Sequence, residues 1–166
     1  MKIITSAPHK IILCGEHFVV YGAPALAAPT NNKSEVVLTS SEGDGKIIFE
    51  SNSGQATYSE GIFRGNDAFK IFIPMIKSIL RDAGELEENL EIKIINANVP
   101  KGMGSSSSIG IAIALSLLTY LNKKYNEDDL FFYGQMVDEI AHGGKPSGID
   151  ARTISRGKPQ KFYKTF

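Results

Sequence analysis

Two glycines and four consecutive serines, in the stretch GMGSSSS of residues 102–108, precede an apolar run over residues 109–118. A flexible linker would not lead directly into such a run, so we interpret the stretch as a tight loop that opens a buried helix. Glycines let a backbone approach a ligand closely, serine hydroxyls donate hydrogen bonds, and a helix start carries unpaired N–H groups and partial positive charge. These features favour a phosphate-binding loop, with an ordinary capped helix as the alternative. No Gly-Lys-Ser/Thr sequence follows, so the loop is not of the Walker A type.

Two further stretches combine residue types that can do chemistry. Residues 7–22 read APHKIILCGEHFVVYG, and residues 138–150 read DEIAHGGKPSGID. The candidate residues in these stretches are Lys10, Glu16, His17, Ser147 and Asp150. Taken singly, each has an ordinary explanation: a solvated lysine beside a strand, a structural histidine, or an aspartate that shapes a glycine-rich turn. Only their combination with the glycine and serine loop favours a functional site.

The composition limits the class of protein. The 166 residues are 42% hydrophobic and 22% charged, which is typical of one globular domain with a substantial core. The 18 basic residues balance the 18 acidic ones, and no long basic block indicates nucleic-acid binding. The single cysteine, Cys14, cannot form an internal disulfide, and the first residues lack an apolar signal segment. We therefore expect a cytoplasmic protein that binds neither nucleic acid nor membrane.

The elements that must position these residues predict an α+β fold, in which helices pack on a mixed β-sheet. Expected strands cover residues 2–6 and 10–14 around a turn at Pro8, a hairpin of 36–40 and 46–50, and 90–94. Expected helices run from Asn66 or Asp67 to Ala83, with a start or kink near Pro74, then from the serine run, then from Asn126. We expect a loop with one further strand over 51–65, a loop over 143–150, and strand, turn and strand over 153–166.

Together, the three stretches resemble the motifs of the GHMP kinase superfamily. APHKIILCGEH resembles its first motif and PKGMGSSSS its second, while HGGKPSGID is similar to the catalytic-aspartate loop of the mevalonate kinases within it. The order and spacing match over nearly the whole chain. Three departures stand out, because the family usually has Gly at His9, Ser-Ser-Ala-Ala at 105–108, and often Asn at Ala151. Among them, His9 is the residue that would crowd the site.

The resemblance implies a role for individual residues. Asp150 would face the substrate alcohol with Lys10 beside it, and Ser106 and Glu139 would hold magnesium, Glu139 standing eleven residues before Asp150 as in the family. The implied substrate-binding residues are Lys10, Glu16, His17, Ser147 and Asp150. The implied ATP-binding residues are Lys101, Gly102, Met103, Gly104, Ser105, Ser106, Ser107 and Ser108.

The implied reaction is the ATP-dependent phosphorylation of the primary hydroxyl of mevalonate, with Mg²⁺. Phosphoryl transfer requires positioning and charge stabilisation, which phosphate-binding N–H groups and a magnesium site of oxygen ligands supply. An aspartate of ordinary pKa, near 3.9, is a weak base. A lysine that stabilises the developing alkoxide therefore complements Asp150.

The resemblance covers only the N-terminal, ATP- and substrate-binding domain, over residues 1–166. Members of the family are about twice as long, and their third, glycine-rich motif lies in a C-terminal domain that closes the cleft. We expect either a truncated chain or a split gene whose second polypeptide supplies that domain. Phe162, Tyr163 and Phe166 are then expected to form a strand edge that needs a partner.

Three alternatives remain open. One is a related kinase for homoserine, galactose or a phosphorylated mevalonate, although the wording of HGGKPSGID is closest to the mevalonate kinases. Another is a regulatory subunit that only binds nucleotide, although such a subunit has no need of Lys10, Ser106, Glu139 and Asp150 together. The last is a structural α+β domain with a polar helix cap.

Overall fold

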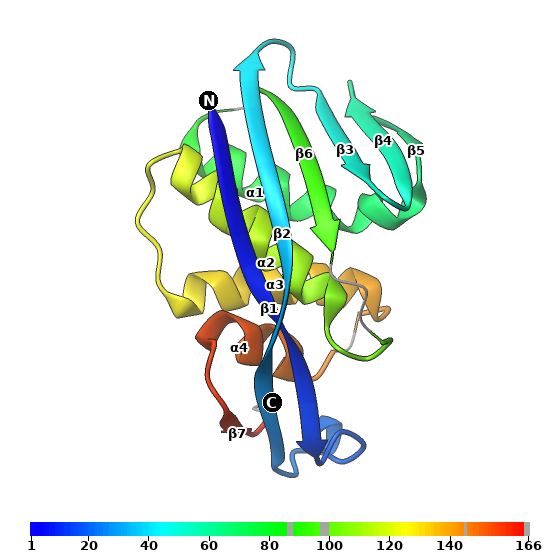
Figure 1. Cartoon of the computed structure of the whole chain (residues 1–166), viewed down its shortest axis with the longest axis vertical. Helices are drawn as coiled ribbons and strands as arrows, with labels where there is room; N and C mark the ends of the chain where they lie inside the picture. Colours follow the sequence, from blue (N-terminus) through cyan, green and yellow to red (C-terminus); the bar gives the residue numbers. More distant parts are fainter. Residues whose placement is uncertain (86–87, 97–99, 145, 165–166) are drawn as a thin grey trace.

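The computed structural model describes residues 1–85, 88–96, 100–144 and 146–164, and its strands form one mixed sheet (Figure 1). The strands are β1 (Lys2–Cys14), β2 (Ala25–Glu42), β3 (Ile47–Ser51), β4 (Gly54–Ser59), β5 (Ile62–Gly65), β6 (Glu88–Asn96) and β7 (Gln160–Phe162). Their order across the sheet is β1-β2-β6-β3-β4-β5, and β7 pairs with the start of β2. Strands β3 and β6 run parallel, while the other described pairs are antiparallel. The predicted α+β class and mixed sheet are confirmed.

The helices lie behind one face of the sheet, as Figure 1 shows. They are α1 (Ile73–Ala83), α2 (Ser105–Tyr120), α3 (Glu127–Ala141) and α4 (Ile149–Arg156), with short 3₁₀ helices η1 (Val19–Tyr21) and η2 (Asp67–Phe72). None of the helices in the described part of the chain is long and apolar enough to cross a membrane. The predicted starts are confirmed at two of them: the Asn66 side chain caps η2, and Asn126 forms a capping box with Asp129 at α3.

Helix α2 is the buried centre of the fold, because it packs on β1 and β2 on one side and on α3 on the other. Most of its apolar side chains are buried, among them Ile111 and Leu117. Glycines bring α2 and α3 together: a Cβ at Gly110 would lie 2.9 Å from Cγ2 of Val137, and one at Gly134 would lie 3.0 Å from Ile111. This close approach places the first turn of α2 against the last turns of α3.

The turn predicted at Pro8 is wrong, because β1 continues through it as one strand. The register of β1 against β2 shifts between Pro8, which pairs with Lys33, and Lys10, which pairs with Pro29. This bulge allows two consecutive residues, His9 and Lys10, to be buried together. His9 fits inside the sheet, where its Nε2 atom lies 3.2 Å from Oγ of Ser34.

The hairpin predicted between residues 36–40 and 46–50 is also wrong. Both segments are strands, but β6 lies between them and pairs with each. Ile92 of β6 is opposite Leu38 on one side and Phe49 on the other, and all three side chains are buried. The local turn signal therefore identified a change of direction and not the neighbouring strand.

Two further predictions need correction. Residues 51–65 form two strands, β4 and β5, instead of a loop with one strand. Residues 149–156 form helix α4 instead of loop and strand, because buried Ile149 and Thr153 stand one helical turn apart and Ile154 follows them. The later strand is confirmed as β7, although Phe166 lies outside the described residues.

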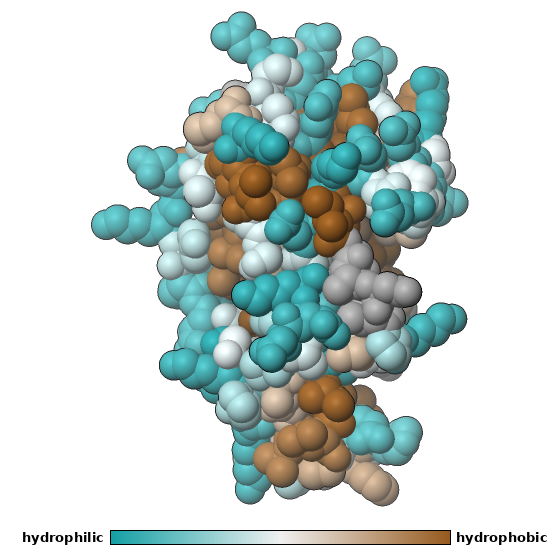
Figure 2. Space-filling view, viewed as in Figure 1, coloured by the Kyte–Doolittle hydropathy of each residue, from teal (hydrophilic) through white to brown (hydrophobic). Residues whose placement is uncertain are grey.

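The end of β1 and the start of β2 extend as an arm, which is closed by the loop that contains η1 and has β7 paired along β2 (Figure 1). Large apolar side chains are exposed on this arm, and Figure 2 shows apolar residues gathered at that end of the molecule. We name Leu13, Phe18, Tyr21 and Leu26 the apolar tip; their exposed fractions are 65%, 66%, 80% and 43%. An exposed apolar cluster of this kind is typical of an interaction surface.

Candidate active site

The glycine and serine loop is a tight loop in front of a buried helix, as predicted. Gly104 is the N-cap of α2 and has a φ of 69°, in the left-handed region that favours glycine. A Cβ there would lie 3.1 Å from Cγ of Lys10 and 3.2 Å from Cδ1 of Ile154. The backbone of the loop therefore lies directly against the Lys10 side chain.

The four serines differ in what they bind. Ser108 is buried and donates to the carbonyl oxygen of Ala7 at 2.9 Å, which fixes the start of α2 on β1. Ser106 and Ser107 donate to the carboxylate of Asp138 on α3, while Ser105 is half-buried. The polar start of α2 is thus partly a structural joint and partly a cluster around one carboxylate.

Lys10 joins the three stretches that the sequence singled out. Its Nζ atom lies 3.0 Å from Oδ1 of Asp150 and donates to the carbonyl oxygen of Gly102 at 2.8 Å. Its backbone N–H donates to the carbonyl oxygen of Met103 at 3.0 Å. The Lys10 side chain is 5% exposed and that of Asp150 is 19% exposed. This is a largely buried ion pair whose anionic partner, in the first turn of α4, still faces a cavity.

The carboxylate beside the serines is that of Asp138, and not that of Glu139, which the family spacing indicated. Asp138 is 1% exposed, and Ser106 donates to its Oδ1 at 3.1 Å. Burial raises the pKa of Asp138, the hydrogen bond from Ser107 opposes that shift, and the charge of Asp150 adds to it. Glu139 lies one residue further around α3, with its side chain exposed.

Helix phase would have found Asp138 from the sequence. Leu130, Gly134, Val137 and Asp138 are the buried positions of α3, spaced as one face of a helix. A carboxylate on that apolar face needs a partner inside the fold, whereas Glu139 falls off it. The count of eleven residues back from Asp150 passes through the segment between α3 and α4. A difference of one residue in the length of that segment would move the counted position from Glu139 to Asp138.

A cavity of about 210 Å³ lies beside the ion pair. The carboxylates of Asp138 and Asp150 line it, together with Glu16 and Ser147, and apolar walls come from Ile12, Val19, Val20 and Ile149. Its size suits a small molecule with both polar and apolar groups. The cavity thus brings together three candidates from the sequence, Glu16, Ser147 and Asp150. It also includes Asp138, which is the neighbour of a fourth candidate, Glu139.

His17 is the candidate that the structure does not bring to this cavity. Its side chain is 86% exposed, and its Nε2 atom lies 3.7 Å from Oε1 of Glu16 on the exposed loop around η1. Lys101 is likewise exposed, at the outer end of the glycine and serine loop. Both residues can contact a ligand only from the open side of the site.

The oxygen atoms of Ser106 and Asp138 are suitable ligands for magnesium. Among the described residues, no three His, Cys, Asp or Glu side chains cluster as a self-sufficient metal site. Mg²⁺ is commonly held by one or two carboxylates and by substrate phosphates, so a serine and an aspartate at a helix start fit it in ligand type. Two protein ligands alone leave most of the coordination to other oxygen atoms.

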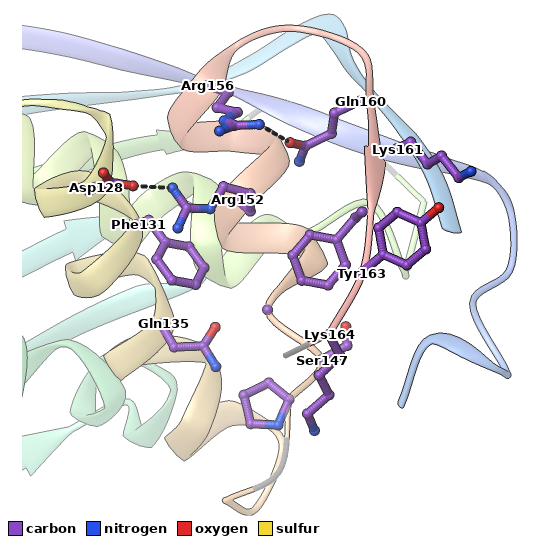
Figure 3. A pocket seen from close by; sticks show the side chains of 13 residues that line it. Asp128, Phe131, Gln135, Ser147, Arg152, Arg156, Gln160, Lys161, Tyr163 and Lys164 are labelled. Atoms are coloured by element: carbon purple, nitrogen blue, oxygen red, sulfur yellow. Dashed lines mark hydrogen bonds and ion pairs between the residues drawn. The ribbon is translucent and has the colours of Figure 1, made fainter. Parts of the chain in front are cut away.

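A larger pocket of about 560 Å³ lies between α3, α4 and β7, on the other side of the loop that contains Ser147 (Figure 3). It is rich in cations, but these are already paired. Arg152 stacks 3.8 Å from the ring centre of Phe131 and bonds Asp128, and Arg156 donates to Gln160 at 3.3 Å. The residues of this pocket pack against the segment that contains Ser147. Its two arginines are held in contacts with neighbouring side chains, so we do not place the reaction there.

Comparisons with known proteins identify relatives of this chain in sequence and in fold. Mevalonate kinase of Pyrococcus furiosus is 30% identical over 95% of this chain and 50% of its own length. The crystal structure of Methanococcus jannaschii mevalonate kinase superposes with a TM-score of 0.83 at 24% identity, over 99% of this chain and 54% of that one. Streptococcus pneumoniae phosphomevalonate kinase has the same fold, with a TM-score of 0.76 at 18% identity, over 99% and 48%.

This chain spans about half the length of the curated relatives that it matches. The family of GHMP kinase N-terminal domains matches residues 70–158, a segment that runs from η2 through the serine loop and Asp138 to the end of α4. The match thus covers the second and third of the three stretches around the ion pair. The chain therefore belongs to the GHMP kinase N-terminal domain family.

Proposed function

We propose that this chain catalyses the ATP-dependent phosphorylation of the primary hydroxyl of mevalonate, in the cytoplasm. The observation that carries the proposal is the contact of 3.0 Å between Nζ of Lys10 and Oδ1 of Asp150, beside the start of α2. The relatives named mevalonate kinase, such as that of Pyrococcus furiosus at 30% identity, support the choice of substrate.

In this proposal, the triphosphate of ATP lies at the start of α2. The N–H groups of residues 101–107 and the helix dipole neutralise the phosphates that are not transferred, while the N–H of Ser108 already donates to the carbonyl oxygen of Gly104 at 2.9 Å. Asp150 accepts the proton of the attacking hydroxyl, which is a general-base role. Lys10, whose charge lies against that carboxylate, stabilises the alkoxide that develops.

We further propose that Ser106 and Asp138 hold the Mg²⁺ ion, with Asp138 in the role first expected of Glu139. A bound Mg²⁺ would supply positive charge that offsets the negative charge developing on the phosphoryl group. The chain contributes the hydroxyl and the carboxylate, 3.1 Å apart at the start of α2. Asp138 also lines the same cavity as Asp150, so the residues proposed for the metal and for the base face one cavity.

The alcohol is proposed to occupy the cavity of about 210 Å³. Glu16 and Ser147 line it and would contact the polar groups of mevalonate, while Val19 and Ile149 would contact its methyl and methylene groups. The ring of His17 faces solvent in this chain. His17 stays a proposed substrate residue for the site as completed by the second domain of the proposed enzyme.

We propose that activity also needs a polypeptide equivalent to the other half of the relatives, either as a separate chain or as a continuation of this one. The apolar tip supports this requirement, because Phe18 and Tyr21, the N-cap and the last residue of η1, are 66% and 80% exposed. Val19 of the same short helix lines the proposed substrate cavity. An interface that replaces a covalent domain junction is expected to bury more than about 2,000 Å² in total.

A phosphorylation assay with a panel of alcohols tests the proposal. Mevalonate, phosphomevalonate, homoserine and galactose are each incubated with ATP, Mg²⁺ and the enzyme that contains this chain. The highest kcat/KM is expected for mevalonate. A higher kcat/KM for phosphomevalonate would identify phosphomevalonate as the substrate, as in the phosphomevalonate kinase that has the same fold, and would overturn the choice of mevalonate. Nucleotide binding without phosphorylation of any alcohol would instead identify a regulatory subunit.

A further inference from the structure

We propose that Ser107 is a positioning residue that orients the carboxylate of Asp138 toward the bound metal ion, an inference that rests on the proposed function. Oγ of Ser107 lies 2.6 Å from both Oδ1 and Oδ2 of Asp138. Ser106, by contrast, approaches Oδ1 alone, at 3.1 Å. Ser107 thus contacts both oxygens of the carboxylate equally, whereas Ser106 contacts only Oδ1.

Burial separates the roles of these two serines. Ser107 is fully buried, so it cannot reach a ligand in the cavity. Ser106 is half-buried in the same turn and can turn its oxygen to a metal ion. When Ser106 takes part in metal binding, Ser107 is the hydroxyl that keeps the carboxylate in place.

The carboxylate needs such a donor because it is 1% exposed and has little access to water. A buried carboxylate without hydrogen bonds is costly, and it turns toward whatever donor it can find. One hydroxyl against both oxygens fixes the plane of the carboxylate and leaves its remaining lone pairs to the cavity that Asp138 lines. Donors that support ligands in this way commonly determine metal affinity.

The helix packing makes this contact rigid. Gly110 and Gly134 allow α2 and α3 to approach closely, since a Cβ at either position would meet the facing helix at 3.0 Å or less. Ser107 and Asp138 stand on these two helices, so their distance is set by packed backbones and not by flexible side chains. Removing the hydroxyl therefore leaves Asp138 without a substitute donor at that position.

Ser116 provides a matched control for the substitution. It is as buried as Ser107, lies on the same helix α2, and donates to the carbonyl oxygen of Ile113 at 2.8 Å instead of to the carboxylate. Ser107→Ala and Ser116→Ala each remove one buried hydroxyl and its hydrogen bond. Only the first of them changes the surroundings of Asp138.

The test measures Mn²⁺ binding by electron paramagnetic resonance, in the enzyme that contains this chain, with a non-hydrolysable ATP analogue present. Ser107→Ala is expected to weaken Mn²⁺ binding about 10- to 100-fold. Its affinity for metal-free nucleotide is expected to stay at the wild-type value. Ser116→Ala is expected to retain wild-type Mn²⁺ affinity, and thermal unfolding in EDTA shows that both variants are folded.

Asp138→Asn distinguishes failure of this inference from failure of the proposed function. If Asp138→Asn weakens Mn²⁺ binding while Ser107→Ala and Ser116→Ala do not differ, the positioning role is overturned and the metal site stands. If Asp138→Asn leaves Mn²⁺ binding unchanged, the metal lies elsewhere and both proposals fail. Equal weakening by the two serine variants would show a general effect of losing a buried hydroxyl on α2 and would also overturn the positioning role.

Discussion

The Nζ atom of Lys10 lies 3.0 Å from Oδ1 of Asp150, although Lys10 stands in the first strand and Asp150 in the last helix. The bulge at His9 turns Lys10 inward, and the start of α4 brings Asp150 to meet it. A lysine with 5% of its side chain exposed is rare unless it is paired. The fold thus brings a cation and a carboxylate together beside the glycine and serine loop that opens α2.

Lys10→Met is expected to lower turnover about 10²- to 10³-fold, because the developing alkoxide loses its nearest cation. Steady-state kinetics with mevalonate and ATP measure the effect. Lys93→Met is the control, since Lys93 forms an ion pair of 3.1 Å with Glu50 on the exposed part of the sheet. Wild-type turnover in Lys10→Met, or equal losses in both variants, would contradict the assignment.

Asp138→Asn and Ser106→Ala are expected to raise the Mg²⁺ concentration for half-maximal activity by about tenfold or more, because each removes an oxygen ligand. Glu139→Gln is expected to leave it unchanged, since that side chain is exposed. Magnesium titrations of the three variants provide the measurement. A shift in Glu139→Gln alone would restore the assignment that the family spacing indicated.

Local patterns predicted the elements whose signals lie in their own residues. The apolar run after the serines identified α2, and Asn126 and Gly84 identified a helix start and a helix end. The hairpin failed because β6, far along the chain, inserts between β2 and β3. No turn signal near residues 41–45 contains that information.

The site shows the same division between local and distant information. Lys10 and Asp150 were chosen from the resemblance, and the structure brings them together. At Glu139, the residue that the resemblance implied as a metal ligand, the side chain is exposed, whereas its neighbour Asp138 is buried on α3 beside the serines. The contact of Ser107 with that carboxylate was not foreseen, because it depends on how closely two helices pack.

Gly104→Ala is expected to reduce both stability and activity. Alanine would have to adopt the left-handed backbone that Gly104 has, with a φ of 69°. Its Cβ would also lie only 3.1 Å from Cγ of Lys10. The strain is about 1–3 kcal/mol. Gly84→Ala is the control, because its φ is 80° and nothing lies within 4 Å of a Cβ there. Thermal unfolding should detect a loss in both variants, and turnover should fall only in Gly104→Ala.

Phe18→Ser, within the apolar tip, is expected to weaken association with the complementary C-terminal half by about 2 kcal/mol, or roughly 30-fold. The reason is that a side chain 66% exposed in this chain would be buried in the complex. Ile62→Ser, at a residue 52% exposed on β5, is the control. Titration calorimetry with the separately produced half gives both affinities. Equal affinities for the two variants would place the interface elsewhere.

Transfer of phosphate to mevalonate in Asp150→Asn tests the central claim most directly. The variant keeps the size of the side chain next to Lys10 but removes the base, so turnover is expected to fall about 10²- to 10⁴-fold. Affinity for the ATP analogue is expected to stay at the wild-type value, because the phosphates bind at α2. Asp128→Asn, at an aspartate paired with Arg152 outside the cavity, is expected to retain wild-type turnover. Near wild-type transfer of phosphate to mevalonate by Asp150→Asn would contradict the account.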